Sequence, residues 1–491
     1  MPTIKFNKTF SVPKIIVTFL KGICLTLAAL TLATPAHAQL VTKFFAFPND
    51  KTQGSRPTGS LIQATDGDLY STTQNEGQVS GGLGVVFKIS TNGTFTKLKT
   101  FNTGADGVFP TAGVVQGTND GNFYGTTFIG TLPLLRGSIY RMTPAGEVTN
   151  LVTFIGTNGF YPNCALVQGA NGNFYGTTTG GTTNEGAFAG GGTNSVAVTN
   201  GTIFMVTPSG ALTTLVAFAE INGKNPVAGL LLHSNGNFYG TTQNGGTNGL
   251  GTVYQMTPGG TLTSLYSFAG IDGANPFGGL TIGTNGNLYG TTQGGGLNSF
   301  GTIFTITTSG TLTTLVNFDD VNGSAPKAAP KQASNGYFYG TTSTGGTAIP
   351  PGSARGTVYQ LAPNGTLTTL YTFQGYNFPS GFPSDGATPE ADLMQASDGN
   401  LYGTTRAGGS ANNCGTVFKV DLRPLLTSTL IGTDIVLSWL DYATGYTVQS
   451  ATNLNSPIGW VDLTNAPVVV DGRFVVTDAV SGDAKFYRLK K

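Results

Sequence analysis

Charged residues, cysteine and histidine are all scarce in this sequence. Lys, Arg, Asp and Glu make up 10% of its 491 residues, against about 25% in an average soluble domain. No basic run or stripe occurs, so we expect no nucleic-acid partner. After residue 38 the chain holds one histidine, His233, and two cysteines, Cys164 and Cys414. These residues lack metal-ligand spacing, so we expect no metal site, no cofactor and two unpaired thiols.

Long apolar runs are missing as well, except at the N-terminus. There, four lysines precede the run "ICLTLAALTLATPA", which ends at "AHA" (36–38). A charged start, an apolar stretch and a small-residue cleavage site are typical of a secretory signal peptide. The run is shorter than the ~20 residues that a membrane-spanning helix needs. We therefore predict a signal peptide over 1–38, no membrane span in the mature chain, and a monomer that is secreted or at the cell surface.

Glycine is abundant, with 74 residues, and much of it belongs to one repeated motif. "GNFYGTT" occurs at 121–127, 172–178 and 236–242, and close variants occur four more times. The tyrosines of the seven copies are 54, 51, 64, 50, 50 and 63 residues apart. A period near 50 residues indicates a solenoid or a propeller. The motif tyrosines are Tyr70, Tyr124, Tyr175, Tyr239, Tyr289, Tyr339 and Tyr402.

Each repeat contains four short runs that are typical of β-strands. In residues 279–318 these are "GLTIG", "NLYGTT", "GTIFTIT" and "LTTLVNF", separated by segments rich in Gly, Asn and Ser. β-Branched and aromatic runs bounded by such turns indicate antiparallel hairpins. No segment after the signal peptide has a helical period. Four antiparallel strands in about 50 residues form the blade of a β-propeller.

The two ends of the repeat region complement each other. First, second and third strands occur seven times, but fourth strands follow only six of the third strands, and none follows "GTVFKVD" (415–421). "LVTKFFAF" (40–47) resembles the fourth strands and precedes every first strand. We therefore predict an all-β fold, with a seven-bladed β-propeller over 39–421 that the N-terminal strand closes, because closure removes exposed edges. An open solenoid is the alternative.

The expected topology places all the long insertions on one face. In a four-stranded antiparallel blade, the turns after the first and third strands share one face. The loops after the second strand and the connectors between blades share the other, which we call the insertion-bearing face. Long segments occur only there, at 128–136, 179–200, 343–355 and 374–391. Variable loops on a rigid scaffold commonly carry binding residues.

The repeat resembles a known family. "DGANPFGGL", "NGNLYGTTQGGG", "GTIF" and "SGTLTTLVNF" are similar to the Gloeo/Verruco (GloVer) tandem repeat of exported bacterial proteins, over about 40–420. This resemblance implies an exported β-repeat protein of the bacterial cell envelope and carries no agreed activity. The tail, 422–491, resembles a small fibronectin type III β-sandwich, with Trp439 and Tyr446 as expected core aromatics.

The residue inventory gives little support to catalysis. His233 stands at the end of a first strand without a cysteine or histidine partner, so we interpret it as structural. The repeated Asp-Gly and Asn-Gly pairs suit turns that need positive φ better than they suit calcium. Glycosidase chemistry needs two carboxyl groups at a fixed separation, and no motif proposes such a pair. The five glutamates of the mature chain each occupy a different repeat position: Glu76, Glu147, Glu185, Glu220 and Glu390.

Aromatic residues gather in the loops and connectors of the insertion-bearing face. They either fill gaps between blades or form platforms for sugars and extended polymers. The favoured function is an exported, non-catalytic binding or surface-scaffold protein whose partner is a polysaccharide or another envelope protein. The alternatives are a glycan-active hydrolase or lyase, and a purely structural envelope component. The candidate ligand-binding residues are Phe160, Tyr161, Phe188, Phe277, Phe300, Arg355, Tyr376, Phe378 and Phe382.

Overall fold

The computed structural model is an all-β, propeller-like repeat fold built from four-stranded antiparallel sheets. The residues that it describes are 41–48, 52–75, 83–102, 106–130, 136–181, 200–347, 355–374, 385–409, 413–422, 426–440, 445–452, 458–470, 473–479 and 485–490. Within these ranges the one helical element is a 3-10 turn, η2 (Glu220–Asn222). Among the same residues, no helix has the length and apolar character to cross a membrane.

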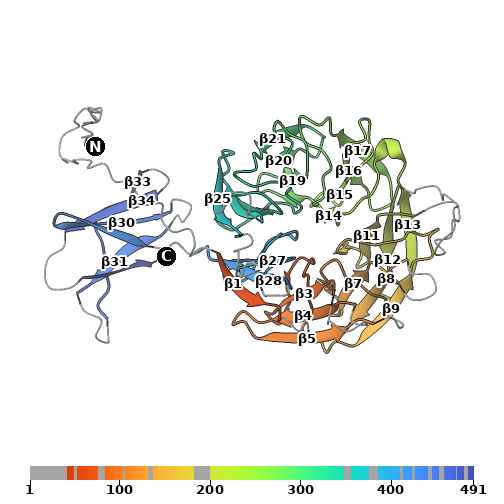
Figure 1. Cartoon of the computed structure of the whole chain (residues 1–491), viewed down its shortest axis with the longest axis horizontal. Helices are drawn as coiled ribbons and strands as arrows, with labels where there is room; N and C mark the ends of the chain where they lie inside the picture. Colours follow the sequence, from red (N-terminus) through yellow and green to blue (C-terminus); the bar gives the residue numbers. More distant parts are fainter. Residues whose placement is uncertain are drawn as a thin grey trace, which may run out of the picture. The chain divides into compact units, whose positions relative to one another are not determined.

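Every repeat contributes its strands in the same order, from a short inner strand outwards (Figure 1). The first strands are β2 (Ile62–Gln63), β6 (Val115–Gln116), β10 (Val167–Gln168), β14 (Leu231–Leu232), β18 (Thr281–Ile282), β22 (Lys331–Gln332) and β26 (Met394–Gln395). The second strands are β3 (Leu69–Thr73), β7 (Phe123–Thr127), β11 (Phe174–Thr178), β15 (Phe238–Thr242), β19 (Leu288–Thr292), β23 (Phe338–Thr342) and β27 (Leu401–Thr405).

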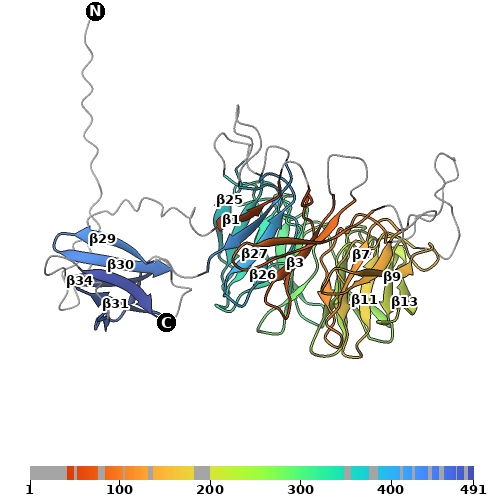
Figure 2. The ribbon, with the colours of Figure 1, turned by 90° about the horizontal axis from the view of Figure 1, so that it is seen from below.

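The third strands are β4 (Val85–Ile89), β8 (Ser138–Met142), β12 (Thr202–Val206), β16 (Thr252–Met256), β20 (Thr302–Ile306), β24 (Thr357–Leu361) and β28 (Thr416–Val420). The fourth strands are β5 (Phe95–Thr100), β9 (Val148–Thr153), β13 (Leu212–Ala217), β17 (Leu262–Ser267), β21 (Leu312–Asn317) and β25 (Leu367–Thr372). The sheet of the last repeat takes β1 (Val41–Ala46) in the fourth place, with Val41 opposite Val420. Figure 2 shows β1 beside this sheet from a second direction.

The tyrosine of each motif anchors the turn that precedes it. In three repeats the phenol donates a hydrogen bond to the turn aspartate four residues earlier, as in Tyr70 to Asp66 at 2.7 Å. In the other four the turn asparagine donates to the phenol oxygen, as in Asn235 to Tyr239 at 2.8 Å. The following glycine has positive φ, for example 83° at Gly236. The "DG" and "NG" pairs therefore serve turn geometry.

The two threonines of the motif join strands and neighbouring sheets. In six repeats the second threonine pairs with a hydroxyl residue opposite on the third strand, as in Thr242 with Thr252 at 2.8 Å. In five repeats the first threonine donates to a carbonyl of the next repeat, as in Thr241 to Gly278 at 2.9 Å. Buried hydroxyls thus satisfy the backbone where sheets meet, since an unpaired buried carbonyl is costly.

The first repeat departs from this pattern where the last repeat adjoins it. Ser71 replaces the motif glycine, and its hydroxyl donates to the carbonyl of Gly59 at 2.9 Å. Gly59 occupies the same position in its repeat as Gly278, whose carbonyl accepts a hydrogen bond from Thr241 of the preceding repeat. Thr404, the corresponding donor of the last repeat, has no hydrogen-bond partner for its buried hydroxyl among the described residues. At this position of the first repeat, the carbonyl of Gly59 therefore accepts its hydrogen bond from Ser71 of the same repeat. At five other junctions between repeats, the equivalent carbonyl accepts from a threonine of the preceding repeat.

The third strands alternate between phenylalanine and tyrosine at one buried position. Repeats 2, 4 and 6 have Tyr140, Tyr254 and Tyr359, and the other repeats have phenylalanine. All three tyrosines are completely buried, and their hydroxyls have no hydrogen-bond partner among the described residues. Burial raises the pKa of each phenol. These hydroxyls are therefore a cost to the fold that the phenylalanine repeats avoid.

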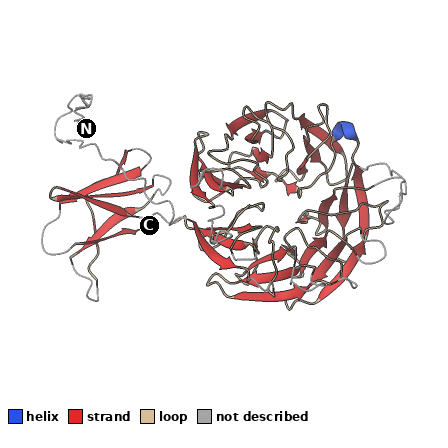
Figure 3. Cartoon of the chain, viewed as in Figure 1, coloured by secondary structure: helices blue, strands red, loops and turns tan. Residues whose placement is uncertain are grey.

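The residues after 422 form two further sheets (Figure 3). One has the order β29 (Thr427–Ile431), β30 (Asp434–Leu440), β34 (Arg473–Ala479), β33 (Val468–Val470), and the other has β32 (Val461–Asp462), β31 (Thr447–Ala451), β35 (Phe486–Lys490). Their core contains Leu437, Trp439, Val448 and Val476, and Tyr446 packs against it partly buried. Both expected aromatics thus contribute to this core.

We predict that Tyr254→Phe increases the free energy of unfolding by about 1 kcal/mol, because an unpaired buried hydroxyl costs about 1–3 kcal/mol. Urea unfolding of the purified protein measures the change. Tyr239→Phe is the matched control, since its hydroxyl accepts a bond from Asn235 at 2.8 Å and its removal should cost about 1 kcal/mol. Equal losses in the two variants would contradict the interpretation.

Candidate functional site

The segments that lead into the innermost strands enclose a central pocket of about 500 Å³. All seven repeats contribute to its wall. Because these segments are the ends of the connectors between sheets, the pocket belongs to the insertion-bearing face. The lining consists of Thr58, Ser60, Gln74, 111–113, 163–167, 227–230, 277–280, Lys327, 390–392 and Arg406.

One six-residue pattern builds the wall. Its second position is always proline, its fourth is a small residue, and its sixth is an apolar residue or proline. The third and fifth positions vary in residue type, as in "NPFGGL" (275–280) and "TPEADL" (388–393). The residue before the proline has positive φ in all seven repeats, between 51° and 57°. Its N–H donates to a carbonyl of the preceding repeat, for example Asn275 to Leu250 at 2.8 Å. This left-handed turn fixes where the residue after the proline lies.

Small residues allow these segments to touch through their backbones. A Cβ on Gly59 would lie 2.7 Å from the backbone nitrogen of Gly113 in the next repeat. A Cβ on Gly278 would lie 2.9 Å from the carbonyl carbon of Ala328. Such contacts are shorter than van der Waals packing permits, so only glycine fits without a shift. The wall therefore consists of tightly packed backbone, and its chemistry comes from the variable positions.

The residue after the proline supplies most of that chemistry. In chain order it is Thr58, Thr111, Asn163, Val227, Phe277, Lys327 and Glu390. All seven side chains belong to the pocket lining. The seven equivalent positions therefore hold two threonines, an amide, an aliphatic group, an aromatic ring, a cation and an anion, although the hydroxyl of Thr111 is itself buried.

A cluster of charged groups occupies one side of the pocket. The Lys327 ammonium lies 2.7 Å from a Glu390 carboxylate oxygen, and both side chains are largely buried. Arg406, at the start of the loop after β27, lies 3.8 Å from the same oxygen. Lys327 also stands 5.4 Å from the centre of the Phe277 ring, a favourable cation–π position. Two cations therefore share one glutamate.

Asp392 lies beside this cluster in a different environment. Its carboxylate accepts hydrogen bonds from the Ala329 N–H at 2.9 Å and from the Ser60 hydroxyl at 3.3 Å. Burial raises the pKa of this carboxyl, although those two hydrogen bonds and the charge of Lys331 oppose the rise. The pocket thus holds one carboxyl group in an ion pair and a second whose pKa is raised by burial.

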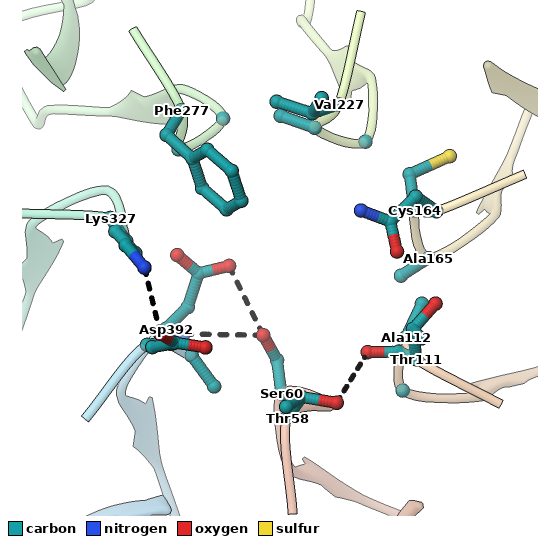
Figure 4. Close-up of a pocket in the computed structure, with 18 of the residues that line it drawn as sticks. Thr58, Ser60, Thr111, Ala112, Cys164, Ala165, Val227, Phe277, Lys327 and Asp392 are labelled. Atoms are coloured by element: carbon teal, nitrogen blue, oxygen red, sulfur yellow. Dashed lines mark hydrogen bonds and ion pairs between the residues drawn. The ribbon is translucent and has the colours of Figure 1, made fainter. Parts of the chain in front are cut away.

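The opposite side of the pocket is apolar. Figure 4 shows Lys327, Asp392 and Ser60 on one side and Val227, Ala165 and Cys164 on the other. The Cys164 sulfur accepts hydrogen bonds from the N–H and the hydroxyl of Thr177, both at 3.2 Å. Burial raises the pKa of this thiol, which disfavours the reactive thiolate. Both Cys164 and Cys414 are buried and unpaired.

Among the predicted ligand-binding residues, Phe277 lines this pocket. Tyr161 is the residue before the proline of its repeat, with φ 57°, and its ring stacks on Phe128 at 4.7 Å. Phe160 packs edge-to-face on Tyr161. The carbonyls of Phe300 and Arg355 accept the hydrogen bonds of two pre-proline residues. These four residues shape or surround the wall and are not part of its lining.

The other predicted ligand-binding residues are Phe188, Tyr376, Phe378 and Phe382, and they lie outside the described residues. Sequence reasoning missed Ser60, Lys327, Glu390, Asp392 and Arg406. The signal for four of them, all but Arg406, is in the six-residue pattern, where two positions vary in residue type while their neighbours do not. Within the described ranges, no three His, Cys, Asp or Glu side chains gather closely enough to hold a metal ion.

Comparison with known proteins gives a family and a set of distant structures. The family model of the Gloeobacter/Verrucomicrobia repeat matches residues 29–188 and 182–418. No curated protein matches the sequence. Among solved structures, the chain is similar to a putative 6-phosphogluconolactonase from Bacteroides fragilis, at 14% identity over 86% of this chain and 100% of that chain, with a TM-score of 0.44.

Two further solved structures are similar to the chain at equally low sequence identity. A gluconolactonase from Xanthomonas campestris shares 14% identity over 62% of this chain and 86% of its own, with a TM-score of 0.38. A polysaccharide lyase described as an ulvan lyase shares 13% identity over 69% and 82%, with a TM-score of 0.38. Similarities this distant identify no activity for the chain.

We predict that the stability of the Asp392→Asn variant differs from that of the parent protein in a pH-dependent way. A raised pKa in the folded state means that stability falls as the pH rises from the unfolded pKa through the folded pKa, by up to about 1.4 kcal/mol per pH unit. Asparagine cannot ionise; its amide oxygen can accept from the Ala329 N–H, and its NH2 group can donate to the Ser60 hydroxyl. The free energy of unfolding of the variant, measured with urea, should therefore increase relative to that of the parent between pH 3.5 and pH 7.

Glu147→Gln, at an exposed turn position, is the control for this pH experiment. It should show little change relative to the parent at either pH. An Asp392→Asn variant that loses stability relative to the parent as the pH rises would contradict a raised pKa.

Proposed function

The chain belongs to the Gloeobacter/Verrucomicrobia repeat family, and from this premise we propose that it is an exported protein that binds a carbohydrate in its central pocket. In this proposal a signal peptide directs the chain to the cell surface or the medium. The repeats form a closed seven-bladed propeller, and a fibronectin type III-like sandwich follows it. The propeller is a scaffold that holds the pocket on its insertion-bearing face.

The observation that carries the proposal is the set of seven residues that follow the repeated prolines. The backbone around them is nearly the same in every repeat, and six residue types occupy the seven positions. A purely structural role would need no such variety at positions that all face one cavity. A volume of about 500 Å³ lies within the roughly 300–1,000 Å³ that is typical of small-molecule sites.

The chemistry of the wall favours a sugar over other small molecules. Thr58 and Asn163 supply a hydroxyl and an amide group, which bond sugar hydroxyls without demanding a charge. Phe277 supplies an apolar ring face suited to the C–H face of a pyranose. Lys327 and Arg406 offer cations to ring oxygens or to an acidic substituent.

A glycan-active hydrolase or lyase is the second candidate, and the two carboxyl groups favour it. Glu390 pairs with Lys327 at 2.7 Å and lies 3.8 Å from Arg406, whereas burial raises the pKa of Asp392. Two carboxyl groups in unlike environments are the usual arrangement of an acid and a base. Release of reducing ends or unsaturated products from a polysaccharide, lost in both Glu390→Gln and Asp392→Asn, would establish this candidate in place of binding alone.

The binding proposal is tested by calorimetric titration of the mature protein with neutral and acidic oligosaccharides from bacterial and plant cell walls. We predict that Phe277→Ala weakens binding at least tenfold, about 1.4 kcal/mol, because the ring is the main apolar surface beside the charged cluster. Phe300→Ala, in the loops outside the pocket, should leave the affinity unchanged. Unchanged binding in Phe277→Ala, with loss in Phe300→Ala, would move the site to the loops. Absence of binding to every glycan would refute the proposal.

The proposed closure has its own test at Phe47. This ring is completely buried and packs edge-to-face on Phe87 and Phe95, at 5.4 and 5.9 Å. We predict that Phe47→Ala costs about 3–5 kcal/mol of unfolding free energy. Thr42→Ala, at an exposed position of β1, the strand that ends just before Phe47, should change the free energy of unfolding by less than about 0.5 kcal/mol. A stable protein after deletion of 39–47 would contradict closure.

A further inference from the structure

Exposed aliphatic side chains in the repeat region are confined to one face. Among its described residues, the large hydrophobic side chains with high exposure all lie in connectors or in loops after second strands. Both kinds of segment belong to the insertion-bearing face, and none of these side chains lies in the tight turns of the other face. They are Ile155, Ile221, Ile271, Leu297, Phe300 and Val321.

Three of these side chains occupy equivalent positions in consecutive connectors. Ile221, Ile271 and Val321 each stand three residues after the buried phenylalanine that follows a fourth strand. Their exposed fractions are 69%, 69% and 61%. Leu297 and Phe300 lie in the loop after β19. This loop comes between the connector that contains Ile271 and the connector that contains Val321. We call these five residues the aliphatic rim.

Hydrogen bonds hold the segments of the rim together. In each case a glycine N–H of one loop donates to a carbonyl of the preceding connector: Gly246 to Glu220 at 2.7 Å, Gly296 to Gly270 at 2.8 Å, and Gly346 to Asp320 at 2.6 Å. Asparagine side chains then bond each loop to the next connector, with Asn248 donating to the Phe268 carbonyl and Asn298 to that of Phe318. The rim is therefore a continuous and ordered surface that needs little rearrangement to bind.

The charge around the rim is acidic. Glu220 is exposed beside Ile221, and Asp319 and Asp320 are exposed beside Val321. Across the three connectors, 219–224, 269–274 and 319–324, the one basic residue is Lys224, which lies 3.8 Å from Glu220. An acidic surface repels anionic lipid headgroups and nucleic acids. Four of the five rim residues are aliphatic and lack the flat ring that binds sugars well.

We propose that the aliphatic rim is a docking surface for a protein segment that carries aliphatic side chains flanked by lysine or arginine. The aliphatic groups of such a segment would cover the exposed isoleucines, leucine and valine. Its cations would pair with Glu220, Asp319 and Asp320. Exposed apolar surface bordered by polar groups is characteristic of protein interaction sites. The rim is distinct from the central pocket, so the protein would bind a partner and a saccharide independently.

The test uses three labelled synthetic peptides of equal length, followed by fluorescence anisotropy. One combines leucine with lysine, one leucine with glutamate, and one serine with lysine. We expect the leucine–lysine peptide to bind at least tenfold more tightly than either of the others, and its affinity to fall as salt increases from 50 to 300 mM. The triple variant Ile221→Ser/Ile271→Ser/Val321→Ser should lose at least tenfold in affinity for it.

Ile155→Ser is the matched control, because Ile155 is half exposed on the same face but does not share the rim's position in its connector. It should keep full affinity for the peptide. Glu220→Lys/Asp319→Lys should reverse the preference towards the leucine–glutamate peptide. Circular dichroism and saccharide titration check that the triple variant retains its fold and its pocket.

Several results would overturn the proposal. Equal binding of the leucine–lysine and leucine–glutamate peptides would remove the role of charge, and unchanged binding in the triple variant would remove the rim. Binding of phosphatidylglycerol vesicles that the triple variant loses would assign the rim to a lipid surface. Self-association in analytical ultracentrifugation, abolished by the triple variant, would assign it to a second copy of the chain.

Discussion

The backbone N–H that precedes each repeated proline holds this fold together around its pocket. In every repeat that N–H donates to a carbonyl of the preceding repeat, and Arg56 of the first repeat donates to Cys414 of the last. The residue must adopt a left-handed conformation to do so, which costs about 1–2 kcal/mol for a residue with a side chain. The hydrogen bond and the packed proline offset that cost. Because all seven turns share this geometry, they bring seven equivalent side chains to one cavity.

The general architecture could be predicted from the sequence because it depends on repeated local signals. Turn pairs such as Asn235–Gly236 and alternating β-branched runs mark the strands, and a repeated signal is stronger than a single one. The N-terminal run that resembles a fourth strand supplies the strand missing from the last sheet, where β1 pairs with β28. The first strands are shorter than expected, two residues each, since the chain turns away to line the pocket.

The site was harder to predict, for a physical reason. Long insertions and aromatic loops drew attention to residues such as Tyr161 and Phe300, whose backbones support the pre-proline turns. The pocket instead arises from the shortest and most regular part of each connector. Lys327 lies in one segment, and Glu390 and Asp392 lie together in another, with 63 positions between Lys327 and Glu390. No local pattern joins the two segments, because the packing of consecutive sheets brings them together. Phe277 could be predicted because it is both aromatic and in a connector.

The six-residue wall pattern separates shape from chemistry, and this has a consequence for how such a protein changes over generations. The backbone of the wall is fixed by proline, small residues and one hydrogen bond per repeat, none of which involves the variable side chain. A single substitution after one proline can therefore alter one point of the cavity without disturbing the wall, except at Lys327 and Glu390, where it also breaks their ion pair. Ligand preference can drift in small independent steps, without passing through unfolded intermediates. For the same reason, the seven positions are suitable for randomisation and selection of variants with new ligand specificities in the laboratory.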